Sequence, residues 1–466
     1  MTWENDQRNT AAGVWQMKKV ITYGSFDLFH DGHYNLLKRA KALGDYLIVG
    51  VTTEQYDEYR GKMNVVDSLM QRIEHIKQTG FADEIIIEDH EGQKIEDIQK
   101  YGIDIFTVGS DWTGKFDFLK NYCDVVYLER TKGISSTMMR QKNYKIVRLG
   151  IIGSGRIAVR FAPEVKYVSG SNLEGIYNPR LDSARRFAQQ FELKFFTDDL
   201  RKFLEKVDAV YIASPHNTHY EYIRKALESG KHVLCEKPMV LQARQAEEVY
   251  QLAKRKDLVL LEGIKTAYAP GFLQLLAIAQ SGRIGRIRDV EACFTKLISG
   301  NIRELRPEEN GGSLTELASY PLLAIIKLLG TDYKDFRFET FIDENGIDLY
   351  TKIYLHYENS VSTAKIGLGV KSEGQLLISG TQGYVYVEAP WWKTKHFEVR
   401  HEQPEHNEKF FSKFVGEGFR YELSDFISLI NGNVKKGFKL TAKESIAISK
   451  IIEAFLTKER TLIMKY

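Results

Sequence analysis

The feature that most constrains this chain is a glycine-rich turn that begins about a third of the way along it. In the stretch Lys145–Ala158, a short apolar run leads into Gly153 and Gly155, and a helical pattern follows with Ala158 in the third small position. In such a Gly-x-Gly-x-x-Ala turn the first glycine makes the bend, the second lets the backbone approach a pyrophosphate, and the small third residue lets the helix pack on the strand. Alone, the pattern also fits an ordinary connection between a strand and a helix. Here it opens a new α/β unit after residues 18–143, which already read as a complete α/β domain, so the sequence predicts two nucleotide-binding modules in series.

Length and composition fit a globular protein of several domains, with 466 residues of which 43% are hydrophobic and 27% charged. The formal net charge of +3 comes from mixed signs without a long basic run, so we expect no nucleic-acid partner. Cys123, Cys235 and Cys293 are far apart and form no C-x-x-C pair, which indicates reduced thiols in a cytoplasmic enzyme. No apolar run approaches the roughly 18 residues of a membrane span, so no membrane contact is expected. Residues 1–17 lack the apolar segment of a signal peptide and are expected to be an N-terminal extension.

The first domain contains two histidines at a predicted helix start. A strand, Lys19–Gly24, is followed by residues 25–33 (Ser-Phe-Asp-Leu-Phe-His-Asp-Gly-His) and then by an amphipathic pattern. His30 and His33 lie on either side of Gly32, at a helix start, where backbone N–H groups and the helix dipole favour anions. Imidazoles there would offset the charge that builds on a triphosphate when its α-phosphorus is attacked. The alternative for this motif alone is a pair of incidental loop histidines.

Two later segments also indicate nucleotide chemistry. Residues 109–120 (Gly-Ser-Asp-Trp-Thr-Gly-Lys-Phe-Asp-Phe-Leu-Lys) place an acid and an aromatic residue at a strand end, which suits binding of a base and ribose. Residues 129–137 (Glu-Arg-Thr-Lys-Gly-Ile-Ser-Ser-Thr) place an arginine and hydroxyl groups at another helix start. Helix capping by a hydroxyl would account for one of these residues but not for the neighbouring Arg and Gly.

Together, the His-x-Gly-His motif and these two segments resemble the glycerol-3-phosphate cytidylyltransferases, over nearly all of residues 18–141. The resemblance implies a Rossmann-like nucleotidyltransferase domain that couples CTP to glycerol phosphate or a similar polyol phosphate. It also implies Mg²⁺ with the CTP and no covalent enzyme intermediate. Matched position by position, the catalytic residues would be His30, His33, Lys62 and Arg130. CTP would be bound by Ser25, Phe26, Asp27, Gly32, Asp111, Trp112, Ser135 and Ser136, and the acceptor phosphate by Arg72.

The strand ends of the second module carry polar residues. Residues 172–178 form the strand after the glycine turn, and it ends in Asn178 and then Arg180 where NAD enzymes usually have an acid for the ribose hydroxyls. An arginine there can accept a 2′-phosphate, so NADP(H) is favoured over NAD(H); the alternative is a solvated arginine at the next helix start. Charged residues such as Glu236 and Lys237 at the carboxyl end of a parallel strand point into the ligand crevice. As lone residues they would more often form a surface ion pair.

The glycine turn, Ser-Pro-x-x-x-His at 214–219, Gly-Lys-His-Val-Leu-Cys-Glu-Lys-Pro at 230–238 and Gly-x-Ile-Gly at 282–285 resemble the Gfo/Idh/MocA oxidoreductases over residues 146–466. The resemblance implies an NAD(P)-binding Rossmann domain at 144–268 and an α+β open-sheet domain at 269–466. That sheet would carry the substrate floor and form a homodimer or homotetramer. The implied catalytic residues are Lys237, Tyr320 and Glu316. The implied cofactor-binding residues are Gly153, Gly155, Arg156, Ile157, Asn178, Arg180, Ser214, His219 and Glu236.

In this resemblance Lys237 hydrogen-bonds the reacting oxygen, and Tyr320 gives or takes the proton. Glu316 stands where the family has Asp, and its spacing of four from Tyr320 predicts that the two share one helical face. Strands are expected at 287–297, 349–357, 360–368, 375–379 and 384–388, in a largely antiparallel sheet. The helix Ala442–Leu456 is expected to pack on the second module.

The sequence thus favours a bifunctional enzyme that reduces a sugar or ketose phosphate and couples the resulting polyol phosphate to CMP. CDP-polyols of this kind usually supply cell-wall or capsule polymers. One alternative is a cytidylyltransferase with a non-catalytic oxidoreductase-like scaffold, suggested by Glu316 and by Ala267 where many relatives have Arg. Another is an oxidoreductase that acts on the CDP-linked product. The sequence identifies no protein ligands for a metal.

Overall fold

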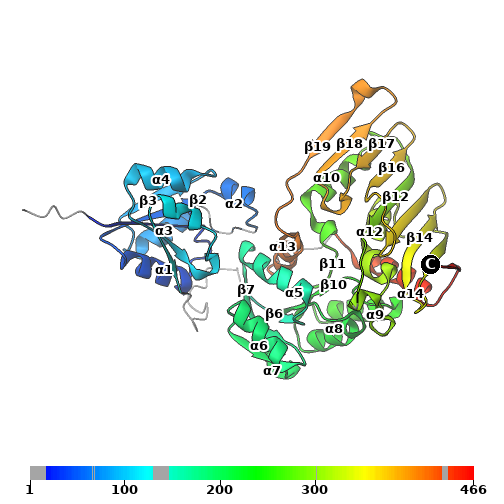
Figure 1. Cartoon of the computed structure of the whole chain (residues 1–466), viewed down its shortest axis with the longest axis horizontal. Coiled ribbons are helices and arrows are strands. Elements are labelled where there is room, and N and C mark those ends of the chain that lie inside the picture. Colours follow the sequence, from blue (N-terminus) through cyan, green and yellow to red (C-terminus); the bar gives the residue numbers. More distant parts are fainter. Residues whose placement is uncertain are drawn as a thin grey trace, which may run out of the picture. The chain divides into compact units, whose positions relative to one another are not determined.

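The computed structural model describes residues 17–63, 65, 67, 69–129, 146–300, 302–432 and 439–466. The chain divides into two compact units, Met1–Gln141 and Lys142–Tyr466, whose elements are labelled in Figure 1. The predicted fold class is confirmed: an α/β unit with a parallel sheet precedes a second parallel-sheet domain of Rossmann type, which is followed by an open sheet.

The first unit is a five-stranded parallel sheet in the order β3-β2-β1-β4-β5. Its strands are β1 (Lys19–Gly24), β2 (Tyr46–Thr52), β3 (Glu84–Glu88), β4 (Ile105–Gly109) and β5 (Asp124–Leu128). Its helices are α1 (Asp31–Lys41), α2 (Glu54–Tyr59), α3 (Leu69–Gln78) and α4 (Gln93–Tyr101). Alternate residues of β1 face two different cores, since Val20 packs with Leu37 of α1 and Ile21 packs with Ile98 of α4.

The second unit begins with a six-stranded parallel sheet in the order β11-β10-β9-β6-β7-β8. The strands are β6 (Val147–Ile152), β7 (Ser171–Tyr177), β8 (Phe195–Thr197), β9 (Ala209–Ile212), β10 (His232–Glu236) and β11 (Leu260–Gly263). The helices are α5 (Arg156–Phe161), α6 (Leu181–Gln190), α7 (Leu200–Lys206), α8 (His219–Glu228) and α9 (Ala243–Arg255). This order reverses at β6, which places the glycine turn at the switch point where such sheets bind ligands.

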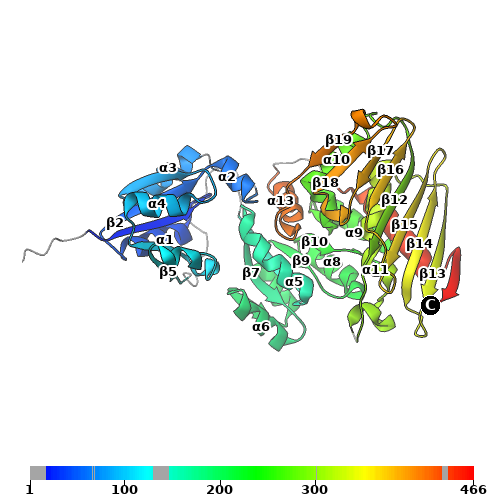
Figure 2. The same cartoon turned by 45° about the horizontal axis from the view of Figure 1, so that its top comes forward.

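A nine-stranded sheet follows, in the order β19-β18-β17-β16-β12-β15-β14-β13-β20, and Figure 2 shows its strands side by side. The strands are β12 (Ile287–Thr295), β13 (Asp335–Ile342), β14 (Asp348–His356), β15 (Val361–Gly367), β16 (Leu376–Gly380), β17 (Tyr384–Val387), β18 (His396–Arg400), β19 (Glu408–Phe411) and β20 (Thr461–Lys465). The helices of this domain are α10 (Pro270–Ala279), α11 (Ser313–Leu317), α12 (Ser319–Leu329), α13 (Phe419–Ile430) and α14 (Ala442–Leu456). The pairs β12–β15 and β13–β20 are parallel and the others antiparallel.

The sequence predicted five of these nine strands, and it missed β13, β18, β19 and β20. The prediction that α14 packs on the Rossmann domain is confirmed, because α14 lies against α9. Within the described ranges no single helix is long and apolar enough to cross a membrane, although the bent pair Pro307–Leu317 and Ser319–Leu329 meets that criterion together.

Candidate active sites

In the first unit, His30 and His33 stack at the start of α1, just after β1. Their ring centroids lie 3.9 Å apart with 18° between the planes. His30 is the N-cap residue of α1, and its Nδ1 accepts a hydrogen bond of 3.0 Å from the Gly32 amide. A Cβ atom on Gly32 would lie 2.7 Å from Cε1 of His30, so a larger residue there would displace the His30 ring. The motif thus presents two imidazoles side by side at a helix N-terminus.

The His33 ring packs against aromatic side chains, and one of its nitrogens has no hydrogen-bond partner among the described residues. Its centroid lies 5.5 Å from those of Phe26 and of Phe29. Burial, followed by the nearby His30 and Lys62, holds the pKa of His33 well below its usual range. Its Nδ1 is buried and has no hydrogen-bond partner among the described residues. His33 is therefore neutral in the free protein, and an approaching phosphate anion would raise its pKa.

Lys62 and Asp27 lie in the same region, as the sequence predicted for residues of one site. Burial lowers the pKa of Lys62, and the nearby Asp57 and Asp27 oppose this shift. Asp27 is almost fully buried, and its Oδ1 accepts a hydrogen bond of 2.8 Å from the Asp67 amide. This region therefore contains a lysine beside two carboxylates and two histidines.

Arg72, expected to face the acceptor phosphate, is fully buried and ties three backbone segments together. Its Nε donates to the carbonyl of Asp67 (3.0 Å), and its Nη1 donates to those of Ser25 (2.9 Å) and Thr52 (2.8 Å). Its Nη2 is buried and has no hydrogen-bond partner in the described part of the chain, although Glu54 Oε1 lies 3.5 Å away. Any role for Arg72 in phosphate binding would depend on this one nitrogen.

The remaining predicted CTP residues are spread over two loops. Phe26 is buried with a positive φ of 52°, a strained conformation of a kind that clusters at functional sites, and Ser25 beside it is half-buried. Asp111 is exposed and Trp112 half-buried on a short 3₁₀ helix after β4. Arg130, Ser135 and Ser136 lie outside the described residues.

The glycine turn of the second unit has the shape that a dinucleotide needs. Gly153 has φ of +98°, and a Cβ there would lie 2.7 Å from the carbonyl oxygen of Ala213. Gly155 is exposed, and a Cβ there would meet nothing closer than 4.0 Å. The turn is therefore an open backbone cradle, which fits a pyrophosphate.

The side-chain amide of Asn178 is buried and hydrogen-bonded to protein atoms, whereas Arg180 is exposed. The Asn178 Nδ2 donates to Ser154 Oγ (2.9 Å), and its Oδ1 accepts from the Arg180 amide (2.9 Å). The Arg180 side chain is left at the surface just before α6. Ile157 is half-buried in α5, and the neighbouring Arg156 forms an ion pair with Glu304.

His219, expected at the cofactor, is fully buried and links two strand ends. Its ring nitrogens lie 2.9 Å from the carbonyl oxygen of Ser214, after β9, and 2.9 Å from that of Pro238, after β10. Burial lowers the pKa of His219 to about 4, so the ring is neutral and donates to one carbonyl at a time. The Ser214 hydroxyl accepts a hydrogen bond from Thr218 Oγ1 (2.7 Å).

Lys237, which directly follows β10, lies close to both of the other predicted catalytic residues. Its Nζ donates a 2.8 Å hydrogen bond to the Glu316 carbonyl and lies 5.7 Å from the ring centroid of Tyr320. Beneath it, Glu236 accepts a 2.5 Å hydrogen bond from Tyr211, and burial raises the pKa of Glu236. The three predicted catalytic residues of this unit therefore lie together.

The prediction that Glu316 and Tyr320 share one helical face is wrong in detail, because two helices carry them. Glu316 lies in α11 and Tyr320 in the first turn of α12, with a break at Ala318. Pro321 has no amide hydrogen to donate to the Leu317 carbonyl, so one hydrogen bond of the helical ladder is missing at the break. The Glu316 carbonyl accepts a hydrogen bond from Lys237 Nζ.

Four residues that the sequence did not single out also surround Glu316 or Arg156: Lys296, Arg303, Glu304 and His216. Arg303 Nη2 donates to Glu316 Oε1 (2.7 Å), and His216 Nε2 lies 3.8 Å from the same oxygen. The first three follow β12, in a connection without helical or strand periodicity. Only His216 had a signal, since it stands beside the predicted Ser-Pro-x-x-x-His segment.

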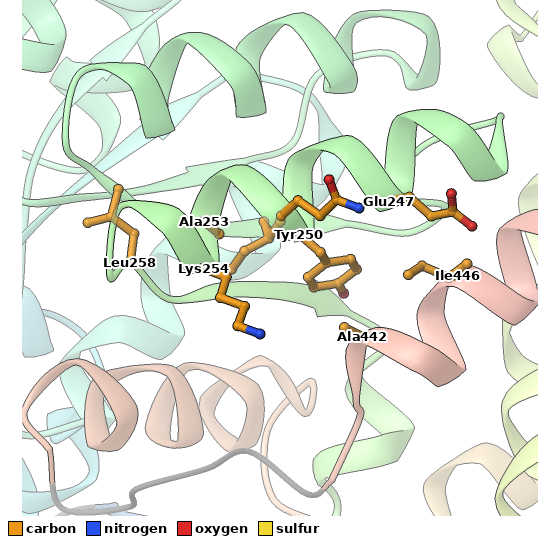
Figure 3. A pocket seen from close by; sticks show the side chains of 9 residues that line it. Glu247, Tyr250, Ala253, Lys254, Leu258, Ala442 and Ile446 are labelled. Atoms are coloured by element: carbon orange, nitrogen blue, oxygen red, sulfur yellow. The ribbon is translucent and has the colours of Figure 1, made fainter.

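A cavity of about 370 Å³ lies elsewhere, between α9 and α14 (Figure 3). It is lined by Tyr250 and Lys254 of α9 and by Ala442 and Ile446 of α14, and it contains none of the predicted site residues. Across the described ranges, no three His, Cys, Asp or Glu side chains are grouped to hold a metal ion.

Comparison with known proteins separates the chain at the same place. Residues 21–142 match the family model described as cytidylyltransferase-like. Residues 147–264 match that of the oxidoreductase family with an NAD-binding Rossmann fold, and residues 272–386 match the GFO/IDH/MocA C-terminal domain.

Individual relatives agree with this division. The glycerol-3-phosphate cytidylyltransferase of Bacillus spizizenii is 53% identical over 125 residues, which are 27% of this chain and 96% of that protein. The scyllo-inositol 2-dehydrogenase (NADP(+)) of Bacillus subtilis is 26% identical over 318 residues, 66% of this chain and 95% of that protein. The crystal structure of KijD10, a 3-ketoreductase from Actinomadura kijaniata in complex with NADP and TDP-benzene, has a TM-score of 0.61 at 24% identity, over 68% of this chain and 99% of that one. Both predicted resemblances are confirmed, and the chain belongs to the cytidylyltransferase-like family through its first unit and to the Gfo/Idh/MocA oxidoreductases through its second.

Proposed function

We propose that this chain is a bifunctional enzyme that makes a CDP-activated polyol. Its first domain (18–143) would transfer CMP from CTP to glycerol phosphate or a similar short polyol phosphate. Its second and third domains (144–268 and 269–466) would reduce the corresponding sugar or ketose phosphate. The observation that carries the proposal is the presence, in one chain, of the stacked His30–His33 pair and of the Lys237–Glu316 contact, each following a parallel strand. Relatives named for glycerol-3-phosphate and for an inositol support a polyol as the shared intermediate.

For the transfer, we propose charge stabilisation without a covalent intermediate. His30, His33 and Lys62 would bind the triphosphate oxygens and offset charge as pyrophosphate leaves, while Arg72 would orient the acceptor. Asp111 and Trp112 would bind the cytidine, and Arg130, Ser135 and Ser136 are expected to contribute from outside the described residues. Mg²⁺ would come bound to the CTP phosphates, as it commonly does in sites with few protein ligands.

For the reduction, a bound nicotinamide supplies the hydride. Lys237 would donate to the carbonyl oxygen of the substrate in place of the Glu316 carbonyl, and its charge would stabilise the developing alkoxide. Burial raises the pKa of Tyr320, so its hydroxyl stays protonated and would give the proton that completes the alcohol. Glu316 would position Lys237.

We further propose NADP(H) as the favoured cofactor and a homodimer or homotetramer as the assembly. The exposed Arg180 and the absence of an acid at Asn178 suit a 2′-phosphate. Gly153, Gly155, Arg156 and Ile157 would hold the pyrophosphate end. Two relatives agree with this preference, since the name of one includes NADP(+) and the other was solved in complex with NADP.

A single incubation tests the proposal. The whole chain is supplied with CTP, Mg²⁺, NADPH deuterated at its transferable position and a panel of three- to five-carbon carbonyl phosphates. Mass spectrometry should find a CDP-polyol that carries one deuterium. A CDP product formed only from ready-made polyol phosphates, with no NADPH consumed for any carbonyl, would contradict the reductive step. Consumption of NADPH only after CTP has acted would instead support reduction of the CDP-linked compound.

A further inference from the structure

The oxidoreductase centre contains a lysine with no hydrogen-bond or ion-pair partner among the described residues. Lys296 follows β12 and is half-buried; burial lowers its pKa, against the opposing effects of Glu304 and Glu316. Lys237 at the reacting end and Arg156 at the cofactor turn also lower the pKa of Lys296. Within the described part of the chain Lys296 makes neither a side-chain hydrogen bond nor an ion pair. A half-buried cation without such a partner is available to an anionic ligand.

Arg303 supplies another hydrogen-bond donor at the same centre that has no acceptor among the described residues. Its Nη2 bonds Glu316 Oε1 at 2.7 Å, but its Nη1 is buried and has no hydrogen-bond partner among the described residues. Lys237 bonds the carbonyl of the same Glu316 at 2.8 Å. Arg303 and Lys237 therefore hold the two ends of one residue, which places a guanidinium a short distance from the group that would bind the substrate carbonyl. His216 adds a buried Nδ1 without a partner in the described ranges.

The charges of this cluster leave a positive excess. Four cations (Lys237, Lys296, Arg303 and Arg156) accompany three carboxylates: Glu304 is paired with Arg156, Glu316 is paired with Arg303, and Glu236 acts electrostatically with Lys237. Lys296 remains as the surplus. One surplus cation and an unfilled guanidinium nitrogen suit an anionic group with several acceptor oxygens, which is the chemistry of a phosphate.

We propose that Lys296 and Arg303 form a phosphate subsite of the oxidoreductase centre, which binds the phosphate monoester of a short carbonyl substrate while Lys237 binds its carbonyl oxygen. The inference rests on the proposed function and deepens it, because a site built for a monoester places reduction before cytidylyl transfer.

The test compares dihydroxyacetone phosphate with dihydroxyacetone as substrates of the whole chain with NADPH. In Lys296→Gln, kcat/KM for the phosphorylated substrate should fall about 10- to 100-fold, the value of one lost charge-assisted contact, while that for dihydroxyacetone stays the same. Arg303→Lys should reduce the same preference. Lys352→Gln, which changes a half-buried lysine on β14 of the same sheet, is the matched control and should alter kcat/KM for neither substrate.

Calorimetric titration of inorganic phosphate into the protein–NADP⁺ complex should show binding that Lys296→Gln removes and Lys352→Gln retains.

The outcomes separate the subsite from the proposed function. Reduction of dihydroxyacetone phosphate with a preference unchanged in Lys296→Gln would overturn the subsite and leave the function standing. Phosphate binding that depends on Lys296, without reduction of any carbonyl phosphate, would support the subsite and overturn the reduction. A loss of NADPH affinity in Lys296→Gln, in place of the loss of phosphate preference, would assign the lysine to the cofactor and overturn the inference. NADPH oxidation that requires prior formation of a CDP-linked compound would overturn the monoester assignment.

Discussion

At the scale of single residues, Lys237 Nζ donates to a backbone carbonyl that the substrate oxygen would replace in the proposed reduction. Because Lys237 is the proposed donor to that oxygen, Lys237→Met should lower kcat/KM for carbonyl reduction about 10²- to 10³-fold, as for other lost charge-stabilising donors. The dissociation constant of NADPH, measured by fluorescence titration, should stay unchanged. Cytidylyl transfer by the same preparation serves as the control for folding. Unaltered reduction by this variant would show that Lys237 is not the catalytic lysine, whereas a wild-type chain that reduces no carbonyl would favour the scaffold interpretation.

The second residue-scale prediction concerns His33. His33→Ala removes one ring of the stacked pair and should lower the turnover of CTP:glycerol-3-phosphate transfer about 10²- to 10³-fold, while NADPH-dependent reduction continues. His90→Ala, which alters a half-exposed histidine of the same unit, is the matched control and should transfer normally. Pyrophosphate release measures both variants. Near-normal transfer by His33→Ala would show that the site is assigned to the wrong residues.

At the scale of elements, a buried carboxyl group joins β11 to α14. Glu262 accepts a 3.0 Å hydrogen bond from the Met239 amide and another from Ser445 Oγ of α14, and burial raises the pKa of Glu262 to about 7. The folded protein thus holds this proton more tightly than the unfolded chain does. The stabilisation is complete below the ordinary glutamate pKa and is lost as the pH rises towards 7, by on the order of 3 kcal/mol.

Glu262→Gln keeps the shape of the side chain and removes its titration. Between pH 5 and pH 8, the thermal midpoint of the oxidoreductase unit should therefore fall more steeply in the wild type than in Glu262→Gln. Differential scanning calorimetry at several pH values measures the difference between the two proteins. Parallel curves would mean that Glu262 is ionised in the folded state throughout this range.

Elements with a strong local pattern were predictable from the sequence, and those fixed by their partners were not. The glycine turn at Gly153 and the apolar parallel strands beside it could be predicted, because the residues within each segment carry the pattern. β20 is different: it is a C-terminal segment that becomes a strand by pairing with β13. The break between α11 and α12 lies beside Pro321, and the Glu316 carbonyl near it is bound by Lys237, a residue far away in the sequence.

The candidate sites divide in the same way. His30, His33 and Lys237 belong to compact motifs whose spacing carries their chemistry. Lys296 and Arg303 lie in a connection of the sheet domain, and only tertiary folding brings them to the centre where Lys237 lies. Sequence patterns therefore gave the reaction class, while the groups that would select the substrate required the three-dimensional arrangement.

At the scale of the whole molecule, each of three hydrophobic cores formed by described residues belongs to one unit. The clusters that contain Val20 and Ile21 draw on residues of the first unit, and the cluster that contains Ile152 draws on the second. Cores without shared members need not melt together, so calorimetry of the full chain should resolve two transitions. A ligand stabilises the unit that binds it, by about 2.7 kcal/mol at a hundred times its dissociation constant. CTP should therefore raise one midpoint and NADP⁺ the other, and His33→Ala should remove only the shift caused by CTP. A single transition that both ligands raise would mean that the two units unfold as one.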